Sequence, residues 1–252
     1  MNYRDTPMSA EAWNRFLWDV SKGALPKYSL LTINGNNGDV DVGTETVWDE
    51  GGAYVWIAAA TTVKIASSSG NDTGAGSGAR TVKITYLTDA YVETEVTKEL
   101  NGQTEVTIAT DVFRINQVEV LTAGATGYNE GIIYCGTGEF TTGKPANVFA
   151  NMAIGRNHLT SMIYTVPAGK TAWIHKISSA VSATVNDSVN LTLHHKESSG
   201  LQHCECFPGA LGAVALPFLD IPAGSDIWMD AVSSVANSQV KTSVFIILET
   251  NA

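Results

Sequence analysis

The sequence predicts an all-β protein: two antiparallel β-sandwich domains, of the jelly-roll or immunoglobulin-like type, preceded by a short N-terminal amphipathic helix. Three observations predict it. Many short segments alternate polar and apolar residues with the period of a strand. The connections between them are short and rich in turn residues, which favours antiparallel pairing. Charged residues make up only 16% of the 252 residues, against roughly 25% in an ordinary globular domain.

The first predicted element is a helix near the N-terminus. Ser9 has the side chain of an N-cap, and Glu11 would complement the helix dipole in the first turn. Lys22, Gly23 and Pro26 supply stop signals. Four apolar residues at helical spacing form one stripe: Trp13, Phe16, Leu17 and Val20. The stripe either packs on the chain's own β domain or docks onto a neighbouring subunit, so these four residues are the interaction candidates.

The predicted domain boundaries follow the turn signals. Residues 1–42 form the helix and an arm, with a loop from Ser29 to about Gly43. Residues 43–136 form the first sandwich, residues 137–158 a linker, and residues 159–252 the second sandwich. The expected strands of the first domain are Thr61–Ala66, Thr81–Tyr86, Val92–Thr97, Thr104–Ile108, Phe113–Leu121 and Gly131–Cys135. Asn101-Gly102 predicts a hairpin. The last strand of the second domain is expected at Gln239–Leu248.

The Ser67 to Gly78 segment is the longest glycine-rich connection in the first domain. A ligand loop and a mobile surface loop both fit its composition, and the surface loop is favoured. A phosphate-binding loop is disfavoured, because such loops need a Lys and a following helix.

One segment of the second domain is repeated. Val166 to Ser179 and Ile221 to Ser234 share a Pro-Ala-Gly turn, a Trp and a Ser pair at matching positions. Pro fixes φ where a strand leaves the ladder, and Gly permits the reversal. We therefore expect two equivalent turns within one domain, each followed by a strand that carries a Trp, Trp173 or Trp228, into the core.

The sequence offers little catalytic chemistry. No metalloprotease, P-loop, dinucleotide or nucleophile-elbow pattern is present, so we expect no enzyme, no catalytic residues and no cofactor. The strongest chemical cluster holds metal-ligand residue types: His194, His195, His203, Cys204 and Cys206. Its spacing matches no standard zinc site, so we expect no metal there and favour histidines at a subunit contact.

Charge limits the partners. The formal net charge is −10 and the pI is about 4.9, and no Lys or Arg cluster is present that could bind a phosphate backbone. Nucleic acid and an anionic membrane are therefore not expected as partners. No signal peptide or apolar run long enough to span a bilayer is found. Three cysteines without an export signal predict reduced thiols and folding in a cytoplasm.

A family resemblance adds to this. Val47-Trp48-Asp49-Glu50-Gly51-Gly52 is followed by the glycine-rich segment up to Arg80, then by Leu100-Asn101-Gly102 and Phe113-Arg114-Ile115-Asn116. This succession, with the turn at Thr165 to Ala172, resembles virion structural proteins of tailed bacteriophages. It covers roughly residues 43 to 180, and Ser67 to Arg80 is its most specific part.

The resemblance implies a non-enzymatic particle component in the virion, assembled in the host cytoplasm. We expect an auxiliary capsid decoration protein anchored through its N-terminal segment. Its partners would be a major capsid or tail protein and copies of itself, with a trimer as one option. The alternative is a tail-associated or fibre protein that binds a host receptor or carbohydrate, with Trp48, Tyr54, Trp56 and Tyr91 as the platform. A β-sandwich hydrolase is the least favoured interpretation.

Overall fold

The computed structural model describes residues 9–182, 188–208 and 212–251. In this part of the chain it has one helix, α1 (Ala10–Ser21), and seventeen strands. The strands form four small sheets arranged in a ring, like the blades of a four-bladed β-propeller. The expected all-β class is therefore correct, and the expected pair of jelly-roll or immunoglobulin-like sandwich domains is wrong.

The strands of each sheet have a definite order in space. Sheet I holds β1 (Tyr28–Val40), β17 (Ser238–Thr250), β12 (Lys170–Ser182) and β15 (Gly212–Ile221). Sheet II holds β11 (Tyr164–Thr165), β16 (Asp226–Ser233), β13 (Val189–Lys196) and β14 (Gln202–Pro208), with β2 (Glu45–Thr46) also paired to β16. Sheet III holds β10 (His158–Thr160), β7 (Arg114–Ala123), β4 (Ala79–Leu87) and β5 (Glu93–Glu99). Sheet IV holds β6 (Val106–Val112), β3 (Thr61–Ser67), β8 (Ile133–Thr141) and β9 (Lys144–Met152).

The error in architecture comes mainly from strand partners. Alternation of polar and apolar residues marks where a strand runs, but it does not say which other strand completes the ladder. The first-domain strands lie close to where they were expected. Their order in the sheets, such as β1-β17-β12-β15, combines strands that are far apart in the chain.

Three local expectations are also wrong, and in two of them strands were missed. The Ser29 to Gly43 loop is mostly strand β1, which pairs with β17 from Tyr28 opposite Glu249 to Val40 opposite Ser238. The expected linker at residues 137–158 contains the paired strands β8 and β9. The Asn101-Gly102 turn exists, with Gly102 at φ 61°. The strands on its two sides, however, belong to sheets III and IV, so no hairpin forms there.

Two hydrophobic clusters fill the interior. One is formed mainly by residues of sheets I and II, with fully buried Ile33, Ile174, Leu191 and Met229 among its members. The other is formed mainly by residues of sheets III and IV and includes Val63, Ile84 and Met152. Burial of one such side chain stabilises the folded protein by about 1.5 to 3 kcal/mol. The two clusters thus divide the molecule into two halves, one built on sheets I and II and the other on sheets III and IV.

The glycine-rich loop is held tightly, contrary to the mobile loop that its composition favoured. The fully buried carboxylate of Asp72 accepts hydrogen bonds from the Ala79 and Glu130 amides at 2.7 and 2.9 Å. It also accepts them from the Gly131 amide at 2.8 Å and the Ser67 hydroxyl at 2.6 Å. The loop therefore closes around a carboxylate.

Two of its glycines are required by close approach. A Cβ on Gly76 would lie 2.0 Å from the Asn71 carbonyl oxygen, and one on Gly78 would lie 2.1 Å from Asp72 Oδ1. Real Cβ atoms do not approach other atoms so closely, so side chains here would push the loop apart. The glycines serve packing, and they do not make the loop flexible.

The two copies of the sequence repeat interlock. The Val166 amide donates to the Ser225 carbonyl at 2.9 Å, and the Gly224 amide donates to the Val166 carbonyl at 2.8 Å. Strand β11, which leads into the first copy, pairs with β16 of the second copy, and β12 of the first copy pairs with β15, which leads into the second. The strand of each copy is thus paired with the strand that leads into the other copy.

The tryptophans of the repeat do not point into the core as expected. Buried Ala172 and Ile174 flank Trp173, and buried Ile227 and Met229 flank Trp228. Both tryptophans are therefore on the outer faces of their sheets, because successive strand residues point to opposite faces. They are half-buried there by other groups.

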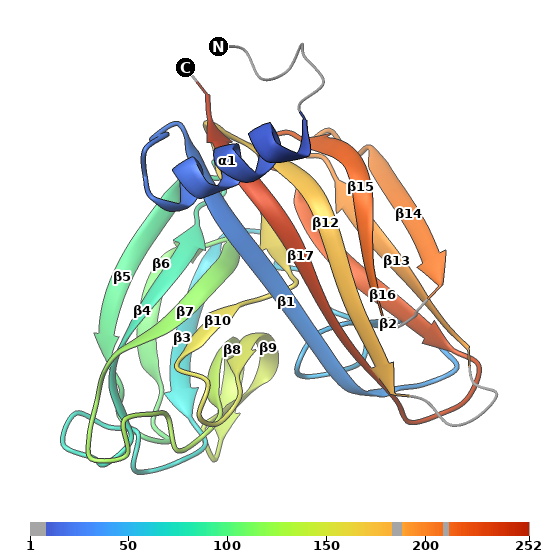
Figure 1. Ribbon diagram of the computed structural model, residues 1–252. Coiled ribbons are helices and arrows are strands. Elements are labelled where there is room, and N and C mark those ends of the chain that lie inside the picture. The colour runs from blue at the N-terminus through green and yellow to red at the C-terminus, as the bar shows by residue number, and fades with distance from the viewer. Residues whose placement is uncertain (1–8, 183–187, 209–211, 252) are drawn as a thin grey trace.

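Helix α1 covers the outer face of sheet I (Figure 1). It begins as expected, with the Ser9 hydroxyl accepting from the Ala12 amide at 3.2 Å. Phe16 and Val20 are buried against Ile247 of β17, with Trp13, Leu17 and Trp173 packed around them. The apolar stripe therefore packs on the chain's own sheet. Contact between its four residues and a second protein stays a prediction.

Candidate functional site

The two halves of the molecule are joined by a buried ion pair. Arg114 of β7 is 8% exposed, and its Nε and Nη2 lie 2.9 Å from the two carboxylate oxygens of Asp226 on β16. Its Nη1 donates to the Ile57 and Phe113 carbonyls at 2.8 Å. Such bidentate geometry fixes both distance and orientation, so this pair sets how the halves meet.

A second contact lies beside it. The Asn116 side chain donates to the Thr165 carbonyl at 2.9 Å and accepts from the Thr165 amide at 3.1 Å. The Thr165 hydroxyl in turn donates to Asp226 at 2.5 Å. The Phe113-Arg114-Ile115-Asn116 motif of the family resemblance is therefore the joint between the halves, and its polar residues have structural roles.

A row of aromatic rings runs from the segment after β2 to strand β16 of sheet II. The Trp48 and Tyr54 centroids are 4.9 Å apart, those of Tyr54 and Trp56 are 4.9 Å apart, and those of Trp56 and Trp228 are 5.6 Å apart. All three contacts are edge-to-face, so neighbouring rings cover one another. Trp48 is buried, and the Tyr54 hydroxyl donates to the Phe149 carbonyl at 3.1 Å.

This arrangement does not bring together the expected sugar platform. Trp48, Tyr54 and Trp56 lie in the row, whereas Tyr91 packs against Phe113 at 5.7 Å, outside it. Stacking on a sugar needs an open ring face. The row is better explained as packing around the joint, where the Arg114 guanidinium also lies 4.8 Å from the centre of the Trp56 ring.

The row ends at a polar cluster on the outer face of sheet II. There His194 of β13 stands directly opposite Cys204 of β14 and Trp228 of β16. Its Nδ1 lies 3.0 Å from Cys204 Sγ, and its Nε2 lies 3.1 Å from Asp230 Oδ2. The imidazole stacks on the Trp228 ring with centroids 4.7 Å apart and planes 6° apart. The structure thus assembles a thiol, an imidazole and a carboxylate in line.

The cluster has further partners. Asp230 accepts from the Trp228 indole at 3.1 Å and from the Thr46 hydroxyl at 3.0 Å. The Gln202 amide nitrogen lies 3.1 Å from His194 Nδ1 and 3.6 Å from Cys204 Sγ. Sequence reasoning placed His194 and Cys204 in one cluster. It missed Asp230, which is distant in sequence and enters only because β16 pairs with β13.

The other members of the sequence cluster lie apart from this line. His195 and His203 face the opposite side of the sheet, where their rings stack at 4.4 Å. Cys206 contacts the Thr192 hydroxyl at 3.5 Å. His194 uses its two nitrogens toward different partners, so its contacts do not converge on one point. Within the described residues, no group of three or more His, Cys, Asp or Glu side chains is placed to hold a metal ion.

His195 is unusual in this sheet. It is 3% exposed, and neither ring nitrogen has a hydrogen-bond partner. Burial lowers its pKa below the ordinary histidine value, the nearby His203 lowers it further, and Glu197 opposes the shift. Cys135, in the other half, is the contrasting thiol, since burial raises its pKa to about 12. Cys135 is therefore a neutral core residue.

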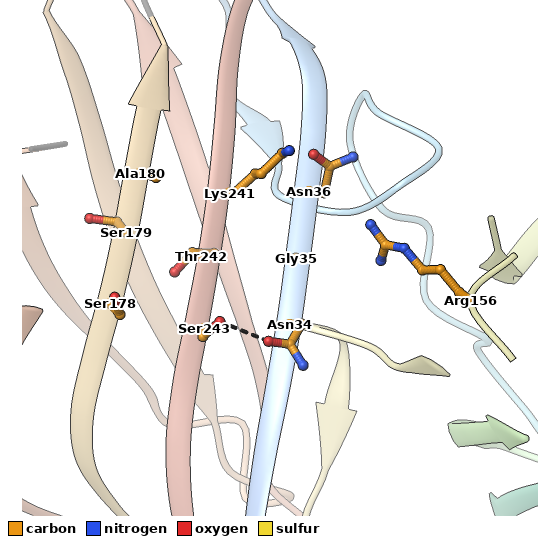
Figure 2. A pocket seen from close by; sticks show the side chains of 10 residues that line it. All are labelled: Asn34, Gly35, Asn36, Arg156, Ser178, Ser179, Ala180, Lys241, Thr242 and Ser243. Carbon is orange, nitrogen blue, oxygen red and sulfur yellow. Dashed lines mark hydrogen bonds between the residues drawn. The ribbon is translucent and has the colours of Figure 1, made fainter. Parts of the chain in front are cut away.

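A polar groove of about 560 Å³ crosses the outer face of sheet I below α1. Figure 2 shows its lining, with Asn34 and Asn36 on β1, Lys241 and Ser243 on β17, and Arg156 reaching in from the facing loop. Ser243 donates to Asn34 at 2.7 Å. Arg156 lies 3.3 Å from Asp49. The groove offers amides, hydroxyls and two cationic side chains, and no sequence pattern pointed to it.

No model of a known protein family matches the chain, and no curated protein matches it. Among solved structures, the chain is similar to one in the structure of infectious bursal disease virus Gt strain. The two share 11% identity over 90% of this chain and 78% of that chain, with a TM-score of 0.20. The VP2 subviral particle of that virus gives 10% identity, 90% and 77% coverage, and a TM-score of 0.21.

A plant protein appears beside these viral chains. The 7S globulin of Momordica charantia gives 6% identity, 91% and 74% coverage, and a TM-score of 0.14. All of these scores are too low to establish a shared fold. They carry no argument about what this chain does. The one helix of the described residues is not long and apolar enough to span a bilayer.

Proposed function

We propose that the chain is a structural component of a virus particle, an auxiliary protein that decorates the capsid and is anchored through its N-terminal segment. This role requires no catalytic residue. The support is the succession of motifs that resembles tailed-phage virion proteins, whose residues build the buried Asp72 loop and the Arg114 joint. Low charge also suits a surface that is covered in an assembly.

One observation carries the anchoring part. Trp18 lies on α1 and is 60% exposed, while Phe16 and Val20 of the same helix are buried against sheet I. Trp is the residue that most often dominates the energy of a protein interface. An exposed Trp on the one helix of the described chain is therefore the best contact point for a capsid or tail protein.

The first test is whether the chain is in the particle. Purified particles of the virus that encodes it are analysed by quantitative mass spectrometry and labelled with gold-conjugated antibodies. We expect the chain in a fixed ratio to the major capsid protein, with gold on the head. Absence from particles, despite synthesis during infection, would overturn the proposal. Gold confined to the tail would overturn the decoration role.

The second test concerns the anchor. The Trp18→Ala variant should unfold like the parent chain but co-sediment with particles that lack the protein at least tenfold more weakly. Val55→Ala is the matched control, because Val55 is 68% exposed and lies outside the helix. Equal binding by the parent and Trp18→Ala chains would exclude anchoring through this face of α1.

The alternative is a receptor- or carbohydrate-binding protein of the tail or a fibre, and the polar groove favours it. Its asparagine amides and serine hydroxyls can pair with sugar hydroxyls, and Lys241 adds a positive charge. A glycan array probed with the parent chain and with Asn36→Ala tests this. Glycan binding that Asn36→Ala removes would support it, and an array without hits would exclude carbohydrate as the ligand.

A further inference from the structure

We propose that Cys204, His194 and Asp230 form a nucleophilic thiol site on the outer face of sheet II, which accepts an acyl group from a small activated ester or thioester. This chemistry goes beyond the structural role and does not depend on it. The line of thiol, imidazole and carboxylate carries the proposal, with 3.0 Å from Sγ to Nδ1 and 3.1 Å from Nε2 to Oδ2.

The arrangement has the elements of an activated nucleophile. A weak nucleophile gains reactivity from a base within hydrogen-bond reach, and a third group must orient that base. The Asp230 carboxylate can accept a hydrogen bond only from a ring nitrogen that carries hydrogen, so it favours the tautomer of His194 that has its hydrogen on Nε2. Nδ1 then presents its lone pair to the Cys204 thiol.

The orienting carboxylate is itself fixed. Thr46 and the Trp228 indole both donate to Asp230, and the Trp228 ring lies flat against the imidazole. All of these groups stand on paired strands. Strands hold side chains in place better than loops do. The imidazole is therefore prevented from turning away from the thiol.

The thiol is open to a substrate, whereas its base is shielded. Cys204 is exposed on the edge strand β14, and the His194 side chain is only 14% exposed. Gln202 lies two residues earlier on the same face, and its amide nitrogen is 3.1 Å from His194 Nδ1 and 3.6 Å from Sγ. An amide donor beside the attacking atom can stabilise the negative charge that develops on a carbonyl oxygen.

The chemical step balances without an oxidant or a metal. Cys204 gives its proton to His194 Nδ1, and Sγ forms a bond to the carbonyl carbon of the ester. The bond from that carbon to the leaving oxygen or sulfur breaks, and the leaving group takes the proton from the imidazolium. The product is an acyl thioester on Cys204, which water can hydrolyse with His194 as the base.

The chain contains its own control. Cys206 is exposed on the same face of the same strand, but its neighbour on β13 is Thr192 rather than a histidine. The two thiols therefore share solvent access, and only Cys204 has a base. We expect iodoacetamide to alkylate Cys204 at least tenfold faster than Cys206 at pH 7, as read by peptide mass spectrometry. Equal rates in the parent chain would overturn the proposal without any variant.

Variants separate the roles. His194→Gln should bring Cys204 down to the rate of Cys206. Asp230→Asn should lower the Cys204 rate several-fold and move its pH profile to higher pH, while the Cys206 rate stays unchanged and the thermal midpoint changes little. That selective shift distinguishes a positioning residue from one that only stabilises the sheet. An unchanged Cys204 profile in Asp230→Asn would remove Asp230 from the site.

The acyl part has its own test. With p-nitrophenyl acetate, the parent chain should release a burst of one p-nitrophenolate per chain and carry an acetyl group on Cys204. Cys204→Ser should abolish the burst and Cys206→Ser should preserve it. Gln202→Ala should slow acetylation more than it changes alkylation, because only acetylation forms an oxyanion. A parent chain that is alkylated selectively but never acetylated would refute acyl transfer.

Discussion

Two aspartates, one in each half, gather hydrogen-bond donors in different settings. Asp72 is fully buried and receives three backbone amides and a hydroxyl. Asp230 lies on an outer sheet face and receives an indole, a hydroxyl and an imidazole. The donors differ in kind. Backbone amides tie a carboxylate to the course of the chain, whereas a side-chain imidazole links it to a group that can move a proton.

The comparison separates a structural carboxylate from a chemical one. Removal of Asp72 leaves buried amides without an acceptor, and each such group costs about 1 to 3 kcal/mol. Removal of Asp230 leaves side chains that can turn toward water. Removal of Asp72 should therefore lower the stability of the fold, whereas removal of Asp230 should lower the reactivity of Cys204.

The largest effect is expected for Asp72→Ala. It should lower the free energy of unfolding by about 4 kcal/mol, because three backbone amides lose their acceptor in the interior. Urea unfolding followed by fluorescence measures this. Asp39→Ala, at an exposed position of β1, is the control and should change stability by less than about 0.5 kcal/mol. A loss below about 1 kcal/mol for Asp72→Ala would show that the loop does not depend on the carboxylate.

The next effect tests the joint between the halves. Arg114→Ala leaves Asp226, whose side chain is only 14% exposed, without its cationic partner and should cost about 3 kcal/mol. Unfolding should also become less cooperative, since the joint sets how the halves meet. Differential scanning calorimetry detects both changes. Arg114→Lys should recover only part of the loss, because an ammonium cannot reproduce the bidentate contact. A single unchanged transition in Arg114→Ala would contradict this role.

A smaller effect concerns His195 and pH. Its folded pKa lies below the unfolded value of about 6.5, so the unfolded chain binds more protons in acid. The fold is therefore more stable above about pH 6.5, where His195 is neutral, and it loses this stability as the pH falls below that value. His195→Leu should raise stability by about 1 kcal/mol at about pH 8, because two unpartnered nitrogens leave the core. The gain should grow at about pH 5.5.

Urea unfolding of both chains at the two pH values measures the His195 effect. His175 is a second histidine whose pKa is lowered, by burial and by Lys176, and it can be compared with His195. A gain for His195→Leu that is the same at both pH values would contradict the titration argument.

The smallest stability effect is expected for Asp230→Asn, below about 1 kcal/mol, since the amide keeps the shape and the groups are partly exposed. Thermal unfolding checks it alongside the reactivity of Cys204. A loss comparable to that of Asp72→Ala would place Asp230 with the structural carboxylates and erase the difference between the two halves.

Much of the local structure could be predicted from the sequence. The N-cap at Ser9, the strands near Thr61, Thr81 and Phe113, and the repeated turns are set by short-range patterns, and they lie where those patterns place them. Strand partners could not be predicted, because β1 and β17 meet only through the whole fold. The same reason hid Asp230, whose register opposite β13 has no local signal.

Two predictions failed because mobility or burial was inferred from residue type alone. The glycine-rich loop looked flexible because its sequence does not reveal that Asp72 would be buried at its centre. The repeat tryptophans looked like core residues because of their size. Successive strand residues point to opposite faces, and here Ala172 and Ile227, the neighbours of the tryptophans, point inward instead. The orientation of a strand can be read only when its buried neighbours are known.

The pairing of β1 with β17 bears on the order of folding. Asn34 and Ser243 meet across this ladder although 209 residues separate them. During synthesis, β1 leaves the ribosome long before its partner exists, so sheet I cannot close until the last strand emerges. The half built on sheets III and IV draws on a shorter stretch of chain and can fold first. Such long-range pairing is slow to form, and until β17 arrives the apolar stripe of α1 has no sheet to cover.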